Sequence, residues 1–268
     1  MPLALPSLRL GSRGPEVQNW QRFLNDAMDA GLSVDGAFGP RTSHATRTWQ
    51  LAHALTPDGI VGPKTRTAAL SHASHSTGHA SLGFIQFLQA KNYTPTAETG
   101  GRVIDLVVVH DMEYFETPDG AEWCAMFFAG VNAPRASAHF SVDVNSIVQS
   151  VREDDVAWHA KGANHNGIGV EHAGYARQSR AEWLDEYSRA ELALSAKLVA
   201  RLCRTYGIPV KWLDADALRA GGGRGITGHW QVTQAFGGTH YDPGPNFPVD
   251  EYLAMVSSAL TALDAGSV

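Results

Sequence analysis

A stretch of small and polar residues near position 75 divides the chain into two parts that fold separately. Residues 71–81 contain only serine, histidine, alanine, threonine and glycine, so none of them can contribute a large side chain to a core. The three histidines of this stretch have no carboxylate or cysteine beside them, which favours a solvated linker over a metal site. We therefore predict a small domain over residues 1–70, a linker over 71–83 and a larger domain over 84–268.

The first part contains an internal repeat. The segment 35–42, of sequence DGAFGPRT, returns at 58–65 as DGIVGPKT. In each copy Asp-Gly predicts a turn, and Gly-Pro predicts a helix that starts with proline. Apolar residues recur at helical spacing around the first copy, at Val17, Trp20, Leu24 and Ala27 and again at Ala45, Trp49 and Ala52. The pattern predicts an all-α bundle of about three short helices, with Trp20, Phe38 and Trp49 in its core.

The second part has the pattern of an α/β domain. An apolar run interrupted only by Asp105 predicts a buried strand over residues 104–109, and alternation predicts a half-buried strand over 138–144. A third strand is predicted over 167–172. Helical spacing predicts a long helix over 181–206 and a last helix from about 250 to 263. Strands interleaved with helices indicate a mixed central sheet flanked by helices.

Composition excludes several classes of protein. The formal charge of −6, from 21 basic and 27 acidic residues, argues against a nucleic-acid-binding surface. The apolar runs are too short to span a bilayer, and the N-terminus lacks the basic and apolar regions of a secretory signal peptide. The only two cysteines, Cys124 and Cys203, form neither a disulfide framework nor a thiolate zinc motif. We interpret them as small buried hydrophobic residues, with a single bridge left open.

Three residues of the second part form a candidate zinc site. His110 ends a strand, His229 stands in Gly-His-Trp, and Asp242 lies in a loop stiffened by two prolines. Two imidazoles and one carboxylate suit a catalytic zinc ion, because three protein ligands leave the fourth tetrahedral position for water. Asp111 and Glu113, which follow His110, are interpreted as loop carboxylates rather than ligands.

The first domain resembles the peptidoglycan-binding domain of the first type. The resemblance rests on the segment 10–17, of sequence LGSRGPEV, which leads into a helix, and on the doubled Asp-Gly-x-apolar-Gly-x-x-Thr motif. It implies binding to the glycan or the peptide stems of the bacterial cell wall. Every residue of the motif also has a folding role, so the motif assigns no wall-binding residue.

The second domain resembles the zinc-dependent N-acetylmuramoyl-L-alanine amidases of the second type, over roughly residues 92–255. The resemblance rests on the order of several short motifs: the strand ending in His110, then Ser137-Ala138-His139-Phe140, Ala157-Trp158-His159-Ala160, Asn166-Gly167-Ile168-Gly169-Val170-Glu171, Gly225-Ile226-Thr227-Gly228-His229 and His240-Tyr241-Asp242-Pro243-Gly244-Pro245. It implies cleavage of the amide between N-acetylmuramic acid and L-alanine by a water that one zinc ion activates. His110, His229 and Asp242 would be its metal ligands.

The resemblance also implies roles for other side chains. Glu171 would take a proton from the water and pass it to the leaving nitrogen. His240 stands where many relatives have lysine, and it would donate a hydrogen bond to the oxyanion while losing its charge at high pH. By analogy, His139 and His159 would contact substrate or orient the ligands, and Trp158 would stack on a sugar or pack.

Together the two domains predict an enzyme that is held on peptidoglycan while it cuts peptidoglycan. Without a signal peptide, such a chain resembles a phage endolysin that stays in the host cytoplasm until the membrane is permeabilised. We expect a monomer with no nucleic-acid or membrane partner. A bacterial enzyme exported by another route, a zinc peptidase acting within the stem peptide, and a non-catalytic peptidoglycan recognition module remain open alternatives.

Overall fold

The computed structural model describes residues 7–66, 68, 69 and 85–265. Contacts within the chain divide it into two compact units, with the division between Phe87 and Leu88. The predicted linker over 71–83 lies outside the described residues. Among the helices that are described, none is long and apolar enough to cross a membrane.

The first unit is helical, as predicted. Its helices are α1 (Pro15–Met28) and α2 (Pro40–Ala52), and residues 63–66, 68 and 69 are also helical. The helices that follow the two copies of the repeat begin at Pro40 and at residue 63, which confirms the predicted Gly-Pro starts, and α1 also has proline in its first turn. Trp20, Phe38 and Trp49 are almost fully buried in one hydrophobic cluster, which confirms their predicted place in the core.

A buried glutamine holds the first copy of the repeat together. The amide nitrogen of Gln21 donates to Asp35 Oδ1 at 2.8 Å, to the carbonyl of Ala37 at 3.1 Å and to Thr42 Oγ1 at 3.2 Å. Its amide oxygen accepts from the backbone N–H of Gly36 at 3.0 Å. One side chain therefore binds both ends of the Asp-Gly-x-x-Gly-Pro-x-Thr segment.

The second copy repeats this network with Gln50. The Gln50 amide nitrogen donates to Asp58 Oδ1 at 2.9 Å, to the carbonyl of Ile60 at 2.9 Å and to Thr65 Oγ1 at 3.0 Å. Its oxygen accepts from the Gly59 N–H at 2.9 Å. Each glutamine follows one of the two core tryptophans, so the repeat also includes a Trp-Gln pair that the sequence analysis did not recognise.

The second unit contains a mixed sheet, as predicted, with β5, β4, β7, β3 and β8 as neighbours in that order. The pairs β4–β7, β7–β3 and β3–β8 are parallel, and β4–β5 is antiparallel. A separate antiparallel pair joins β2 to β6. The strands are β1 (Gln86–Phe87, at the end of the first unit), β2 (Tyr93–Thr94), β3 (Leu106–Asp111), β4 (Phe140–Val142), β5 (Ile147–Gln149), β6 (Val156–Ala157), β7 (Gly167–His172) and β8 (Gly225–Gly228).

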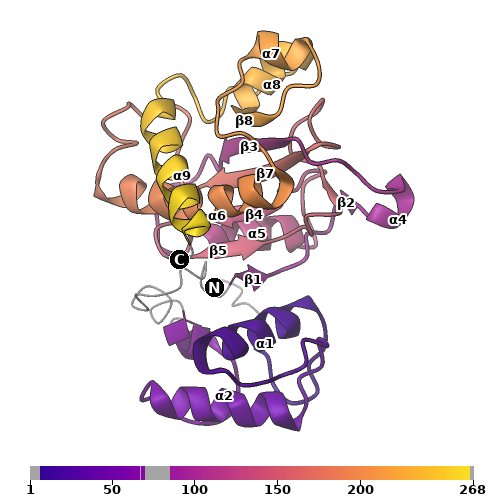
Figure 1. The fold of residues 1–268 in the computed structure, drawn as a ribbon, viewed down its shortest axis with the longest axis vertical. Helices are drawn as coiled ribbons and strands as arrows, with labels where there is room; N and C mark the ends of the chain where they lie inside the picture. The colour runs from indigo at the N-terminus through magenta and orange to yellow at the C-terminus, as the bar shows by residue number, and fades with distance from the viewer. Residues whose placement is uncertain (1–6, 67, 70–84, 266–268) are drawn as a thin grey trace. The chain divides into compact units, whose positions relative to one another are not determined.

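Helices cover both faces of this sheet. The helices of this unit are α4 (Thr96–Thr99), which lies to the side of the sheet, α5 (Gly120–Ala129), α6 (Glu186–Tyr206), α7 (Ala215–Arg219), α8 (His229–Phe236) and α9 (Val249–Asp264). On one face α6 and α9 lie side by side, and His172 of β7 bonds there to Ser195 Oγ of α6 at 2.7 Å (Figure 1). On the other face Ala121 and Ala125 of α5 pack against Val148. Because side chains alternate along a strand, Glu171 points to the α5 face.

Three predicted elements differ from the structure. The first strand continues past the apolar run through His110 to Asp111, because both residues pair with β7. The strand predicted over 138–144 is shorter, and it is buried on both faces rather than half-buried because α5 and α6 both contact it. The long helix starts at Glu186 and not at the predicted residue 181. The Asp185 side chain caps this start by accepting a hydrogen bond from the Ser188 N–H.

Candidate metal centre and active site

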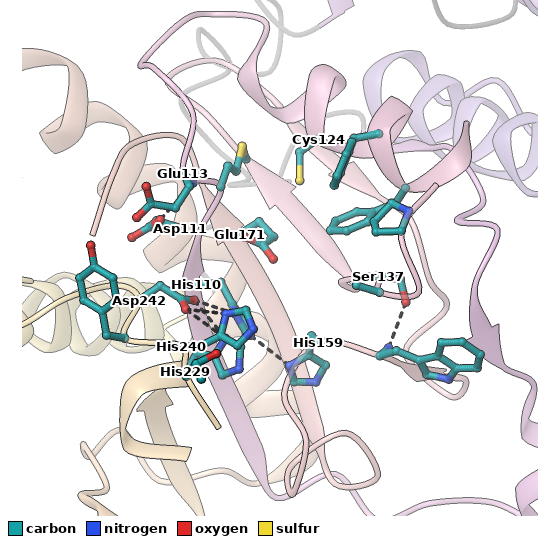
Figure 2. A pocket seen from close by; sticks show the side chains of 18 residues that line it. His110, Asp111, Glu113, Cys124, Ser137, His159, Glu171, His229, His240 and Asp242 are labelled. Carbon is teal, nitrogen blue, oxygen red and sulfur yellow. Dashed lines mark hydrogen bonds and ion pairs between the residues drawn. The ribbon is translucent and has the colours of Figure 1, made fainter. Parts of the chain in front are cut away.

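The three predicted zinc ligands meet in space although they are far apart in the sequence. His110 comes from β3, His229 is the first residue of α8, and Asp242 lies in the loop that follows α8. Nδ1 of His110 lies 3.0 Å from Asp242 Oδ2, and Nδ1 of His229 lies 3.1 Å from Asp242 Oδ1 (Figure 2). One ligand atom from each residue falls within 4.8 Å of the others.

The chemistry and spacing of this cluster fit a zinc ion. Tetrahedral zinc with bonds of about 2.0–2.2 Å separates its ligand atoms by roughly 3.3–3.5 Å, close to the two nitrogen–oxygen distances found here. Burial lowers the pKa of His110 to about 4, so this imidazole is neutral at neutral pH. Burial alone would raise the pKa of Asp242, but hydrogen bonds from His110 and His229 outweigh it and hold that pKa well below its usual range. Neutral imidazole and ionised carboxylate are the forms that bind metal.

Glu171 lies beside the cluster. It is the register partner of His110 on the neighbouring strand β7, and its side chain points to the same face of the sheet. Burial raises the pKa of Glu171 well above its ordinary value, and the charges of Asp242 and Asp111 raise it further. A carboxyl group whose pKa is shifted toward neutrality, next to a metal site, is suited to accept and return a proton.

His240 stacks on one of the candidate ligands. Its ring centroid lies 4.2 Å from that of His229, with 17° between the planes. Its Nδ1 is 3.6 Å from Asp242 Oδ1, too long for a hydrogen bond, and its side chain is 65% exposed. His240 therefore lies at the exposed edge of the cluster, where its ring can be reached from the solvent.

A cavity of about 520 Å³ opens over the cluster. Trp158 and His159 line it, together with Glu171 and His240. The Trp158 indole is half-buried and fixed by a hydrogen bond from Nε1 to Thr94 Oγ1 at 2.9 Å. The remaining lining residues are His110, Asp111, Met112, Glu113, Cys124, Phe127, Phe128, Pro134, Ala136, Ser137, His229, Thr239, Tyr241 and Asp242.

Comparison with known proteins agrees with this site. The profile of the N-acetylmuramoyl-L-alanine amidase family matches residues 100–245, which is more than half of the chain. The chain belongs to this family. A peptidoglycan-binding domain profile matches residues 13–69. The amidase is 30% identical over 136 residues to N-acetylmuramoyl-L-alanine amidase A of Achromobacter lyticus, covering 46% of this chain and 70% of that protein.

Two further relatives cover different shares of the amidase chain. An uncharacterised protein from the bpoA1 3′ region of Kitasatospora aureofaciens is 41% identical over 61 residues, and the chain spans only 52% of that protein's length. The crystal structure of Staphylococcus aureus hydrolase AmiA in complex with its ligand superposes with a TM-score of 0.50 at 21% identity. That alignment covers 68% of this chain and 84% of AmiA, and it shows a shared fold.

His139, predicted from the amidase motifs to contact substrate or to orient the ligands, lies outside the cavity. It is fully buried, directly before β4. Its Nδ1 accepts from the Gly169 N–H at 3.0 Å, and its Nε2 lies 3.2 Å from the carbonyl of Asp155. Both ring nitrogens are thus occupied by backbone groups, so the structure gives His139 a place in the core of the amidase domain and no surface for substrate.

Asp111 is not the loop carboxylate that the sequence predicted. It is the last residue of β3, only 6% exposed, and it lines the amidase cavity. Burial and the charge of Asp242 raise its pKa to about 8. Its Oδ1 accepts from the Glu113 N–H at 3.0 Å, whereas its buried Oδ2 has no partner among the described residues. Glu113 itself is exposed beyond the strand, as predicted.

The two cysteines of the amidase are both buried and both free, which confirms their prediction as small buried residues. Burial raises the pKa of each thiol. Cys124 lies on α5 and lines the cavity together with Phe127, which is 60% exposed. This wall of the site was not predicted, although the apolar run over residues 123–128 is a signal for a segment that packs against the domain.

Proposed function

We propose that the enzyme cleaves the amide between N-acetylmuramic acid and L-alanine with the help of one zinc ion held by His110, His229 and Asp242. The observation that supports this most directly is the meeting of three buried donors and the proton-accepting Glu171 at the floor of one cavity. A zinc ion there would supply a lowered pKa for a water ligand and polarisation of the substrate carbonyl.

Glu171 is the proposed proton carrier of the reaction. In its ionised form it accepts a proton from the attacking water, and in its protonated form it returns that proton to the alanine nitrogen as the amide breaks. Burial raises the pKa of Glu171, which favours the protonated form that returns the proton to the leaving nitrogen. Because Glu171 stands on a central strand beside His110, its carboxyl is held in place by the sheet rather than by a loop.

His240 and two lining residues are proposed to bind the substrate. His240, exposed at the rim, donates a hydrogen bond to the oxygen on which negative charge develops. Trp158 offers an aromatic face fixed by its bond to Thr94, which suits the apolar face of a sugar ring. His159 lines the same wall of the cavity. These roles are supported by position and by side-chain chemistry.

The N-terminal domain is proposed to hold the enzyme on its substrate. The support is the match of residues 13–69 to peptidoglycan-binding domains, next to an amidase domain in the same chain. On an insoluble polymer, such attachment raises the local concentration of amide bonds around the active site. We further propose that the enzyme acts as a phage endolysin, a monomer that degrades the host wall at the end of infection.

Digestion of purified peptidoglycan tests the reaction. Mass spectrometry should find new L-alanine amino termini and intact glycan strands, and a chelator should abolish their release until zinc is added back. New termini at other stem residues would instead indicate a peptidase. Binding without any cleavage, together with a zinc content near zero, would indicate a recognition module. For the endolysin role, expression in host cells should cause lysis only when a membrane-permeabilising protein is made with it.

A further inference from the structure

The cavity has an apolar side, opposite the side that holds the candidate ligands. Figure 2 shows Cys124 and Ser137 on the right and Asp242 on the left, with Glu171 between them. The chain between Cys124 and Ser137 also lines the cavity, with Phe127, Phe128, Pro134 and Ala136. Apart from Ser137, these lining residues are apolar. We call the surface formed by residues 123–137 the α5 wall.

Trp158, a proposed sugar-binding residue, borders one end of the α5 wall. Its backbone N–H donates to Ser137 Oγ at 3.0 Å, and the Ser137 N–H donates to the Trp158 carbonyl at 3.1 Å. Both residues line the cavity. The apolar side of the site is therefore one surface that runs from Trp158 through the α5 wall.

The other end of the α5 wall extends beyond the cavity with exposed aromatic rings. Phe127 lines the cavity and is 60% exposed, and Trp123, outside the cavity lining, is 42% exposed. Residues four apart on a helix are neighbours on its surface, so the two rings lie on one face of α5. An exposed apolar surface that is continuous with a cavity is typical of a binding surface.

Each of these exposed rings is supported by a second ring. The Tyr114 ring centroid lies 5.8 Å from that of Trp123, with 34° between the planes, and the Tyr114 backbone exchanges hydrogen bonds with Gly174 at 3.0 and 2.9 Å. Phe128, buried in the domain, lies 5.7 Å from Phe127 between ring centroids. Rings that are held in place before binding lose little freedom when a ligand stacks on them.

The chemistry of the α5 wall favours an uncharged ligand with apolar faces. Residues 123–134 contain no charged side chain, whereas surfaces that bind anionic lipid are rich in lysine and arginine. Sugar rings are uncharged and present C–H faces that pack on aromatic rings. The amide in question joins a sugar to a peptide, so the cavity has to accept a glycan on one side and a peptide on the other.

We propose that the α5 wall binds the glycan strand of the substrate, with sugar rings stacked on Trp123 and Phe127. The inference rests on the proposed function, because it concerns the substrate of the same cavity. It gives the substrate an orientation: the glycan strand follows α5, and the stem peptide leaves over the polar side, where His240 and Tyr241 line the cavity. Trp123 thereby selects for strands that continue beyond the sugar at the cleaved amide.

Kinetics with two substrates of different length test this proposal. The substrates are a muropeptide with a single N-acetylmuramic acid and a glycan oligomer that has the same stem peptide on several sugars. In Trp123→Ala, the KM for the oligomer should rise about 3–10-fold, and the KM for the single-sugar muropeptide should rise much less. Trp123→Tyr keeps an aromatic ring and should recover most of the loss. Equal changes in both KM values, or a fall in kcat alone, would contradict the proposal.

Phe236→Ala is the matched control for these kinetics. Phe236 is an exposed aromatic residue at the end of α8, outside the cavity lining, and its loss should change neither KM. Thermal unfolding shows whether every variant is folded. A wild type that releases no L-alanine termini from either substrate would refute the proposed function. A wild type that cleaves both, with a Trp123→Ala variant of unchanged KM values, would refute only the role of the α5 wall.

Binding at the α5 wall can also be observed directly. Peptide-free glycan strands should shift the indole N–H signal of Trp123 in ¹H–¹⁵N spectra, where Trp123→Ala identifies that signal. A stem peptide without sugar should leave the signal in place. A shift with the stem peptide and none with the glycan would reverse the orientation and overturn the proposal.

Other occupants of the α5 wall would give different results. A dimer in sedimentation experiments that dissociates in Trp123→Ala and Phe127→Ala would assign the wall to a second copy of the chain. Binding to vesicles of anionic phospholipid that is lost in the same two variants would assign it to a lipid surface. Either result, without a shift on addition of glycan, would overturn the proposal.

Discussion

The two units bury polar side chains in opposite ways. In the N-terminal unit Gln21 and Gln50 are each 1% exposed, and each makes four hydrogen bonds to the loop it supports. In the amidase unit, Asp111 has a buried oxygen without a partner in the described structure. The pKa values of Asp111 and of its neighbour Glu171 are raised mainly by burial.

This contrast separates polar groups that build the fold from polar groups suited to chemistry. A satisfied amide stabilises one arrangement and has nothing left to offer a ligand. A buried carboxyl group that lacks partners keeps its capacity to exchange a proton or to bind. His139 follows the first pattern within the amidase unit, since both of its nitrogens are engaged by the backbone.

The largest expected effect is at Glu171. Glu171→Gln keeps the size of the side chain but removes its capacity to carry a proton, so kcat should fall about 10²–10⁴-fold. Zinc content, measured by metal analysis, should not change. Glu113→Gln serves as the matched control, because it removes an exposed carboxylate from the rim of the same cavity. Equal activity in Glu171→Gln and the wild type would remove Glu171 from the mechanism.

Substitutions of the two buried glutamines of the first unit should lower the stability of that unit and leave the catalytic rate of the amidase unchanged. Gln50→Ala leaves several buried groups without partners and should destabilise the N-terminal unit by roughly 2–4 kcal/mol, measured by urea denaturation. Gln21→Ala should cost a similar amount if the two copies are equivalent. Leu51→Ala, next in sequence but 69% exposed, is the control. Cleavage of a small soluble muropeptide should stay the same in all three variants, and a loss there would contradict the separation of roles.

Substitution of Glu191 in α6 tests whether a buried carboxyl group with only one oxygen hydrogen-bonded lowers the stability of the amidase unit. Burial raises its pKa well above the ordinary value, although the Ala173 N–H donates to Oε1 at 2.6 Å. A raised pKa in the fold means that stability present below about pH 4.3 is lost as the pH rises toward that pKa. Between pH 5 and 8, Glu191→Gln should therefore gain stability relative to the wild type in urea denaturation, and the gain should grow as the pH rises.

Glu186→Gln, an exposed change on the same helix, controls for the loss of one carboxylate. A stability difference between Glu191→Gln and the wild type that stays constant across this pH range would show that Glu191 is ionised within the fold. Its buried environment would then have to supply a partner that the described residues do not.

The smallest expected effect concerns the turns of the repeat. Gly59 has a φ of +75°, and an added Cβ would lie 2.9 Å from both Ser43 Oγ and Arg47 Nε. Gly31 has a φ of +57° and open space around it. Both Gly→Ala variants should lose about 1–2 kcal/mol from backbone strain, and Gly59→Ala should lose more because of the added contact. Equal losses would mean that the side chains around Gly59 move aside easily.

Patterns of residues close together in the sequence predicted the longest helices, the central strands of the sheet and the three candidate metal ligands. The apolar run before His110 and the glycine-proline starts of α1 and α2 are strong signals, because burial and proline geometry each act on a few adjacent residues. The grouping of His110, His229 and Asp242 was also predicted, since their residue types and motif order already matched a metal hydrolase. The structure places these three side chains together.

Features that depend on contacts across the sheet were predicted only in part. The resemblance implied that His159 would contact substrate or orient the ligands. Nothing in its own segment indicates that it touches His110 or rests on strand β7. The end of β3 was misplaced because Asp111 is polar, and only pairing with β7 makes it part of the strand. Gln21 and Gln50 were missed because the spacing from glutamine to the Asp-Gly turn differs between the two copies.

The two copies of the N-terminal repeat interlock through a shared helix. Thr42, which closes the first network, and Gln50, which starts the second, both belong to α2. Neither copy contains all the helices of the domain. Cutting the chain between the two copies would therefore leave two fragments that each lack part of the helical packing. The two networks therefore depend on one helix, and a change that unwinds α2 would loosen both of them.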